Sequence, residues 1–241
     1  MKQKLNDDEN IMVNRYSRKH VTEKDNFSYL LISLIFLLFS SACVEQFFAR
    51  TLLGQALVLA LTVVTMSIGV WSVQSSRFAF KSGLGLVFAT LLISTGVTFL
   101  DIVELEFLHL ILMLLFFITT LKIAAEQALF SGHITTNNII GSICIFLLLG
   151  LIWTVLYLLV AEFIPASFSG LTGERWQDNF PDLIYFSFVT LTTLGFGDLL
   201  PISPIARFLV YSEAIVGVFY MAIVVSSLVG AAMSSHQTRP E

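Results

Sequence analysis

The distribution of charged residues constrains the fold of this chain more than any other feature. Eleven of its 30 charged residues lie in the first 27 positions, which leaves 19 for the other 214 residues. Charged residues make up 12% of the chain, about half of the usual quarter, and hydrophobic residues make up 56%. A water-soluble domain could not cover its surface with so few charges, so we expect an all-α membrane protein.

Six apolar stretches are candidates for membrane-spanning helices. A bilayer core about 30 Å thick requires roughly 20 apolar residues per helix, and the fourth stretch reaches that length if Lys122 extends its amine to the membrane surface. A further stretch, 183–197, carries no charge but is too short to cross, so it predicts a re-entrant segment. The six stretches are 27–44, 51–76, 82–100, 107–121, 139–161 and 208–233.

The basic residues predict the orientation of these segments. Ten of the 13 Lys and Arg residues fall on one side of the membrane if the amino terminus is cytoplasmic. This bias predicts a multi-pass protein of the cell membrane with both termini in the cytoplasm. The re-entrant segment then enters the membrane from outside.

The end of the re-entrant segment carries the most informative motif. Residues 190–198 read T-L-T-T-L-G-F-G-D. Pro181 and Asp182 predict the start of a short helix before it, because proline suits the first helical turn and a carboxylate is favourable at the positive end of the helix dipole. Residues 182–191 would then form a half-helix whose negative carboxyl end points into the membrane and stabilises a cation.

The motif has the composition needed to replace the water around a potassium ion. Rings of backbone carbonyl oxygens can do this, provided that the oxygens of each strand face one axis. The backbone must then alternate between left- and right-handed regions, and Gly195 and Gly197 permit positive φ without a Cβ penalty. Thr193 can add a hydroxyl oxygen, while Phe196 is expected to point away and pack against the half-helix.

Residues 193–198, T-L-G-F-G-D, resemble the T-V-G-Y-G-D selectivity-filter signature of the potassium channel pore family; we call them the filter segment. The resemblance covers 139–233, which would hold an outer helix, half-helix, filter and inner helix in that order. It implies four copies of the chain around one pore, hence a homotetramer that conducts K+ passively. The implied K+ ligands are backbone groups of Thr193, Leu194, Gly195 and Phe196, with Gly197 completing the ion-binding row.

The resemblance also assigns supporting roles around the filter segment, although Leu194 and Phe196 replace the usual valine and tyrosine. Tyr185 stands where relatives often carry a tryptophan, and we predict that its hydroxyl reaches Asp198. The residues expected to support the filter are Asp198, Tyr185, Thr192 and Glu213.

Two residues of the last apolar stretch have alternative explanations. Gly217 lies where the resemblance places a gating hinge, but a glycine also permits close helix contact. Glu213 is the carboxylate deep within this stretch, so it is a functional candidate. It could form a structural hydrogen bond to the residues behind the filter, or it could act as a proton-linked gate.

The first four helices lack the charges that steep voltage sensing requires. The stretch 107–121 contains no Arg or Lys, and Lys122 stands at its end. One charge that crosses the full field contributes about 2.3 kcal/mol per 100 mV, and steep gating uses several per subunit. We therefore predict a conductance with weak or no voltage dependence.

Together, the apolar stretches and the filter segment predict four regions of the chain and one leading function. The regions are a polar cytoplasmic head at 1–27, a four-helix transmembrane domain at 28–130, a pore domain at 139–233 and a short cytoplasmic tail at 234–241. The leading function is a potassium-selective channel that needs no cofactor and has membrane lipid as its further partner. The alternatives are a weakly selective cation channel or, less favoured, a secondary transporter with a broken helix at 195–197. No enzyme motif is present, and a net charge of −4 gives no basis for nucleic-acid binding.

Overall fold

The structure is a computed structural model that describes residues 26–48, 51–72, 77–100, 103–129, 136–173 and 175–237. The described residues are mostly helical, as predicted. Residues 1–25 of the predicted head and 238–241 of the predicted tail lie outside this part. The helices are α2 (Asn26–Phe48), α3 (Leu52–Ser72), α4 (Arg77–Leu100), α5 (Val103–Leu129), α6 (Thr136–Phe163), α7 (Trp176–Leu191) and α8 (Pro204–Gln237).

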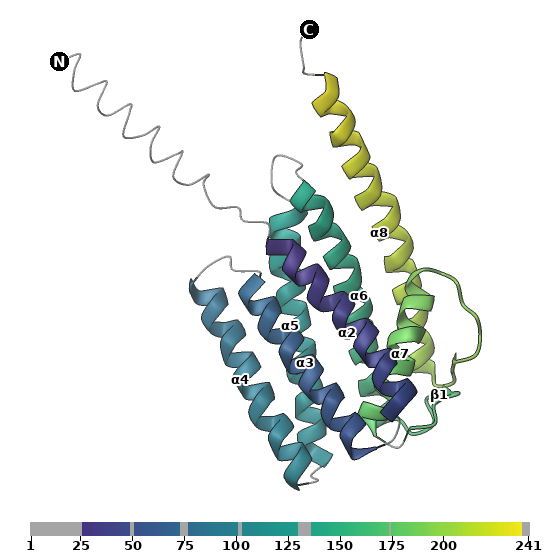
Figure 1. Cartoon of the computed structure of the whole chain (residues 1–241). Coiled ribbons are helices and arrows are strands. Elements are labelled where there is room, and N and C mark those ends of the chain that lie inside the picture. The colour runs from purple at the N-terminus through teal and green to yellow at the C-terminus, as the bar shows by residue number, and fades with distance from the viewer. Residues whose placement is uncertain are drawn as a thin grey trace, which may run out of the picture.

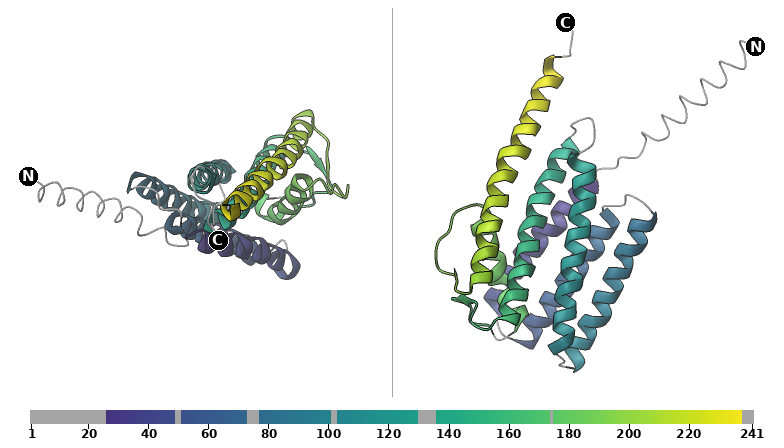
Figure 2. Two further views of the ribbon diagram at one scale, coloured as in Figure 1. Left: turned by 90° about the horizontal axis from the view of Figure 1, so that it is seen from above. Right: turned by 180° about the vertical axis from the view of Figure 1, so that it is seen from behind.

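The helices form two parts, which meet mainly along α6 and also at α7 (Figure 1). Helices α2–α5, the four-helix part, lie side by side, and α2 and α5 both pack against α6. Helices α6–α8 form the three-helix part, in which α7 and α8 pack on α6 and on each other. Figure 2 shows from behind that α8 continues well beyond the ends of the other helices. The buried side chains of α6, among them Leu148, Leu151 and Val155, lie at the centre of the apolar core.

Five of the described helices are long and apolar enough to cross a membrane. Their candidate spans are Phe27–Phe48, Leu52–Ser72, Leu105–Ala128, Asn137–Phe163 and Pro204–Ile223. The predicted span at 82–100 falls in α4, where the apolar stretch Phe80–Gly96 is shorter than the others. The chain is therefore a multi-pass membrane protein, and its sixth crossing stays a prediction.

The predicted re-entrant segment corresponds to α7 and the filter segment. With 16 residues, α7 is about 24 Å long and too short to cross a bilayer. The chain reaches α7 and leaves the filter segment at the same end of the molecule (Figure 1). There β1 (Phe168–Ser169) pairs antiparallel with β2 (Leu200–Pro201), which ties the loop before α7 to the residues after the filter segment.

The predicted start of the half-helix is wrong. Helix α7 begins at Trp176, and Pro181 lies inside it rather than in its first turn. The cause is burial, because Trp176 and Phe180 are fully buried and their rings meet edge to face at 6.1 Å. Asp178, not Asp182, is the carboxylate at the positive end of the helix dipole.

Candidate ion-conduction site

The backbone of the filter segment alternates as expected. Positive φ angles occur at Thr193 (60°), Gly195 (56°) and Gly197 (81°), but not at Leu194 or Phe196 between them. Alternation of this kind can turn the carbonyl groups of a short strand toward one side. The prediction of positive φ for the two glycines is confirmed. The positive φ of Thr193 was not predicted, because threonine rarely adopts the left-handed region.

Hydrogen bonds attach the filter segment to the carboxyl end of α7. The Val189 carbonyl accepts from the backbone N–H groups of Leu194 at 2.9 Å and Gly195 at 3.4 Å. The Thr193 N–H donates to the Thr190 carbonyl at 2.9 Å, which holds its unusual conformation in place. The strand therefore begins at the negative end of the α7 dipole, where a cation is stabilised.

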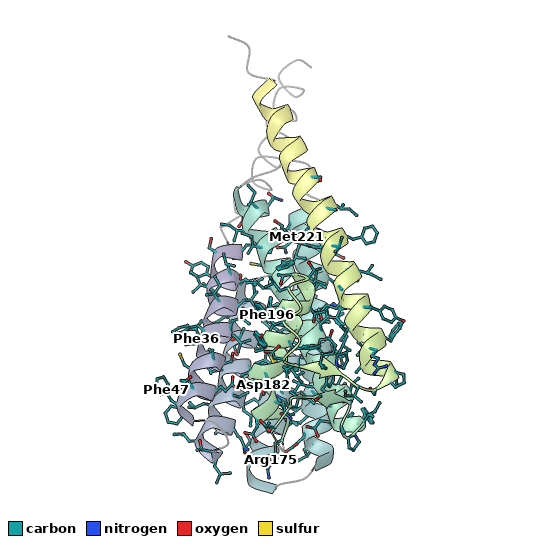
Figure 3. All side chains as sticks on the ribbon, turned by 90° about the vertical axis from the view of Figure 1, so that its right-hand side faces the viewer. Phe36, Phe47, Arg175, Asp182, Phe196 and Met221 are labelled. Carbon is teal, nitrogen blue, oxygen red and sulfur yellow. The ribbon has the colours of Figure 1, made fainter. Side chains whose placement is uncertain are left out.

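One chain leaves the filter segment open. Residues 192–198 are all exposed, and the side chains of Leu194 and Phe196 are 62% and 68% exposed. A Cβ added to Gly195 or Gly197 would meet nothing within 4 Å. Figure 3 shows that Phe196 lies between Arg175 and Met221 along the length of the molecule, so the filter segment sits within the depth of the helices. A single chain thus offers one wall of a site and cannot surround an ion.

Tyr185 contacts the filter segment through both its ring and its hydroxyl group. Its ring stacks on that of Phe196, with centroids 6.4 Å apart and an angle of 3° between the planes. Its hydroxyl donates a hydrogen bond to the Asp198 carboxylate, and this bond, together with the backbone N–H groups of Asp198 and Leu199, lowers the pKa of Asp198 below its ordinary value. The structure therefore places Tyr185, Phe196 and Asp198 together.

Glu213 lies behind the filter segment at the junction of three helices. Its side chain is fully buried. One carboxyl oxygen accepts a hydrogen bond from the Tyr157 hydroxyl on α6, and the other lies 2.5 Å from Ser187 Oγ on α7. The sequence reasoning did not identify Tyr157 and Ser187. Their signal was that each is a polar residue within an apolar stretch, but the sequence does not show that both face Glu213.

Gly217 lies at the closest approach of α8 to α7. A Cβ at this position would be 2.1 Å from the Leu191 carbonyl oxygen, so only glycine fits without a shift. This supports the close-contact explanation of Gly217, while its role as a gating hinge stays a prediction. Beside this contact is a mostly apolar cavity of about 580 Å³. Its lining includes Thr192 and Thr193 from the start of the filter segment and Gly217 and Met221 from α8.

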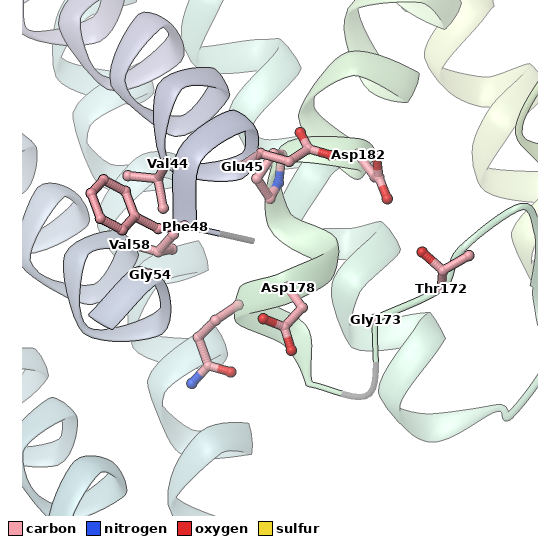
Figure 4. A pocket seen from close by; sticks show the side chains of 11 residues that line it. Val44, Glu45, Phe48, Gly54, Val58, Thr172, Gly173, Asp178 and Asp182 are labelled. Carbon is pink, nitrogen blue, oxygen red and sulfur yellow. The ribbon is translucent and has the colours of Figure 1, made fainter. Parts of the chain in front are cut away.

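The four-helix part contacts the first turns of α7. Gln55 of α3 donates to both carboxylate oxygens of Asp178, at 3.1 and 3.3 Å. The side chains of Glu45 on α2 and Asp182 are joined by a hydrogen bond. Glu45, Asp178 and Asp182 line a cavity of about 70 Å³, shown in Figure 4. The His109 ring of α5 stacks on that of Trp176, with centroids 5.0 Å apart, so three helices of the four-helix part touch α7.

Comparison with known proteins agrees with this geometry. Residues 143–234 match the model of a protein family described as ion channel. The match runs from α6 through α7 and the filter segment to α8, and so covers the three-helix part. Searches of curated proteins and of solved structures give no significant match. The chain is therefore a multi-pass membrane protein that carries an ion-channel domain.

Proposed function

We propose that the chain is one subunit of a homotetrameric, potassium-selective channel that conducts K+ passively across the cell membrane. The observation that carries the proposal is the alternating backbone of Thr193, Gly195 and Gly197 at the carboxyl end of α7. Carbonyl oxygens of Thr193, Leu194, Gly195 and Phe196 coordinate the dehydrated ion in this proposal. No catalytic step and no cofactor is involved.

Several contacts support the proposed roles of the surrounding residues. Thr192 donates its hydroxyl hydrogen to the Phe188 carbonyl at 2.6 Å, which closes the end of α7 just before the filter segment. Tyr185 and Asp198 are bonded beside Phe196, and Glu213 holds α7 from behind. In this proposal, these contacts keep the filter at the diameter that selects K+.

The exposure of the filter segment and of α8 supports assembly from several copies. A strand that is open on one side needs neighbours to complete a ring of oxygens. One face of α8 presents large apolar side chains, which suit contact with other copies or with lipid. They include Phe208, Tyr211, Ile215, Phe219 and Ile223.

The four-helix part supports weak or absent voltage gating. Its helix α5 contains no arginine, and the exposed Lys122 lies near its carboxyl end. His109, also on α5, is buried against Ser94 at 3.2 Å and against the Trp176 ring. No row of cations along α5 can therefore move through the membrane field. The orientation with both termini in the cytoplasm rests on the basic residues and belongs to the same proposal.

Reconstitution of the purified full-length chain into liposomes tests the proposal. We expect K+ flux, a reversal potential that follows the K+ gradient in mixed K+ and Na+, and a particle mass equal to four chains. Equal K+ and Na+ permeation would favour the weakly selective cation channel. Saturable solute uptake without ion conductance would favour the transporter, and a particle of fewer chains would contradict the tetramer.

A further inference from the structure

The buried polar group around Glu213 contains more hydrogen-bond contacts than its hydroxyl groups can supply. Four oxygen–oxygen contacts of 2.8 Å or less lie here, three between α6, α7 and α8 and one within α6. Ser187 Oγ lies 2.8 Å from the Gly150 carbonyl and 2.5 Å from Glu213, and Thr154 Oγ1 lies 2.8 Å from the same carbonyl. The fourth contact joins the Tyr157 hydroxyl to the other carboxyl oxygen of Glu213.

Each contact between two oxygens requires one hydrogen atom. Thr154, Ser187 and Tyr157 each bring one hydroxyl hydrogen, while the Gly150 carbonyl can only accept. Three hydroxyl hydrogens are too few to form hydrogen bonds at all four oxygen–oxygen contacts. If Glu213 were ionised, the single Ser187 hydroxyl hydrogen could be donated either to the carboxylate or to the Gly150 carbonyl. The contact without a hydrogen would then bring two oxygen atoms together that repel each other.

We infer that Glu213 is held in its protonated, neutral form, and that in this form it positions the pore helix α7 for conduction. The carboxyl O–H donates to Ser187 Oγ, Ser187 donates to the Gly150 carbonyl, and Tyr157 donates to the second carboxyl oxygen. Every contact then has its hydrogen. Because Glu213 is fully buried, a charge without a cation beside it would also be unfavourable.

Within the described side chains of the helices around Glu213, the other ionisable groups do not provide such a cation. On α6, Tyr157 is the titratable group in contact with it, and Glu162 lies five residues further on. Among the side chains that the structure describes on α7 and α8, the charged and titratable groups are bonded elsewhere or exposed to the surroundings of the chain. Asp178 bonds Gln55, Asp182 bonds Glu45, Tyr185 bonds Asp198, Arg207 donates to the Pro201 carbonyl, Tyr220 to the Ser142 carbonyl, and Tyr211 is exposed.

The proton matters for conduction because of where Ser187 lies. Two residues after Ser187, the Val189 carbonyl accepts the N–H groups of Leu194 and Gly195, so the position of α7 sets the position of the filter segment. Loss of the proton turns the Ser187 hydroxyl toward the carboxylate and releases it from the Gly150 carbonyl. Conduction should accordingly be full at neutral pH and decline as the pH rises.

Infrared spectroscopy of the reconstituted protein tests the position of the proton directly. A carboxylic acid has a C=O stretch that a carboxylate lacks, so the spectrum at pH 7 should contain a band that is missing in Glu213→Gln. The exposed Glu126 on α5 provides the matched control, because Glu126→Gln should leave the band unchanged. If the wild-type and Glu213→Gln spectra show no difference in this region, the inference is wrong.

A second variant keeps the test valid if Glu213→Gln does not fold. Ser187→Ala removes the group that accepts the carboxyl hydrogen, so the same band should move to higher frequency. A band that stays in place would contradict the inference.

Conduction gives an independent readout of the positioning role. The amide of Glu213→Gln can donate to Ser187 and accept from Tyr157, so this variant should conduct at neutral pH and lose the alkaline decline. An alkaline decline equal to that of the wild type would overturn the positioning role. The conduction measurement rests on the proposed channel function, whereas the infrared band does not. A failure of the proton assignment can therefore be told apart from a failure of the proposed function.

Discussion

Buried hydroxyl groups are used differently in the two parts of the molecule. In the four-helix part, many donate to a carbonyl three or four residues earlier in their own helix, as do Ser33, Ser41, Thr62, Thr65 and Thr90. Such bonds satisfy the hydroxyl group but do not fix one helix relative to another. Contacts between helices occur there too, among them the one from Ser94 to His109.

In the three-helix part, several hydroxyl groups join different helices, while others, such as those of Ser142 and Thr154, donate within their own helix. Tyr157 reaches Glu213 from α6 to α8, Ser187 joins α7 to both, and the Tyr220 hydroxyl donates to the Ser142 carbonyl across α8 and α6. In the three-helix part, such directional bonds between helices therefore lie close to the filter segment.

The largest expected effect on K+ flux comes from a substitution that disturbs the backbone of the filter segment. Gly195→Val places a branched side chain at a φ of 56°. A residue with a Cβ costs roughly 1–2 kcal/mol in this region, or about 4–8 kcal/mol over four copies. We expect K+ flux from liposomes to fall about a hundredfold or more. Gly85→Ala in α4 is the control, because its Cβ would meet nothing within 4 Å. K+ flux that is retained in Gly195→Val would contradict the proposed role of the filter segment in conduction.

A smaller but clear effect is expected at the contact between α8 and α7. Gly217→Ala puts a Cβ 2.1 Å from the Leu191 carbonyl oxygen. Overpacking of this kind costs about 1–3 kcal/mol, so the unfolding temperature in detergent and the conductance should both fall. A gating hinge predicts something else, namely altered open probability with stability retained. Single-channel recording together with thermal unfolding separates the two explanations.

The comparison between the two parts can be measured with a matched pair of variants. Tyr157→Phe leaves a carboxyl oxygen of Glu213 without its donor, and we expect a loss of about 1–3 kcal/mol of stability. Thr62→Val removes a bond within α3 only, and the expected change is within about 0.5 kcal/mol. Denaturation of both variants in the same detergent provides the test. If both variants lost the same amount of stability, hydrogen bonds between helices would contribute no more than those within a helix.

Tyr185→Phe should change the acid side of the pH profile. The Tyr185 hydroxyl lowers the pKa of Asp198, so the bond is formed while Asp198 is ionised and is lost as the pH falls through its lowered pKa. Without the hydroxyl, Asp198 is protonated at a higher pH. If protonation of Asp198 weakens the filter, K+ current should decline at acid pH. We expect that decline to begin at a higher pH in the variant than in the wild type, and inactivation to become faster. An unchanged profile and unchanged inactivation kinetics would remove the role of this bond.

The smallest effect is expected in the four-helix part. Lys122→Gln removes the basic residue of α5, and we expect the dependence of conductance on voltage to keep its shallow slope. Recording in planar bilayers over a wide voltage range checks this. A steep curve in the wild type that flattens in the variant would show that α5 senses voltage.

The sequence predicted those features that depend on local chemistry. Long apolar stretches mark the helices, and the glycine spacing marks the alternating backbone, because both follow from properties of single residues. The start of α7 could not be predicted in this way. Pro181 and Asp182 look like a helix start, but the burial of Trp176 and Phe180 against distant helices extends α7 upstream.

The surroundings of the candidate site were only partly predictable for the same reason. The sequence singles out Glu213 because a carboxylate is rare in an apolar stretch. It cannot show that Tyr157 and Ser187 meet that carboxylate, since they come from separate helices 56 and 26 residues away. The contact of Gly217 with Leu191 likewise depends on how α8 crosses α7.

The length of α8 gives small motions at its middle a large reach. The helix has 34 residues, and 20 of them follow Gly217, which corresponds to about 30 Å of helix. With the Leu191 contact as a pivot, a tilt of about 5° would carry the far end through roughly 2.6 Å. In the proposed tetramer, a helix of this length would turn a slight change in packing beside the filter segment into a larger displacement at its far end.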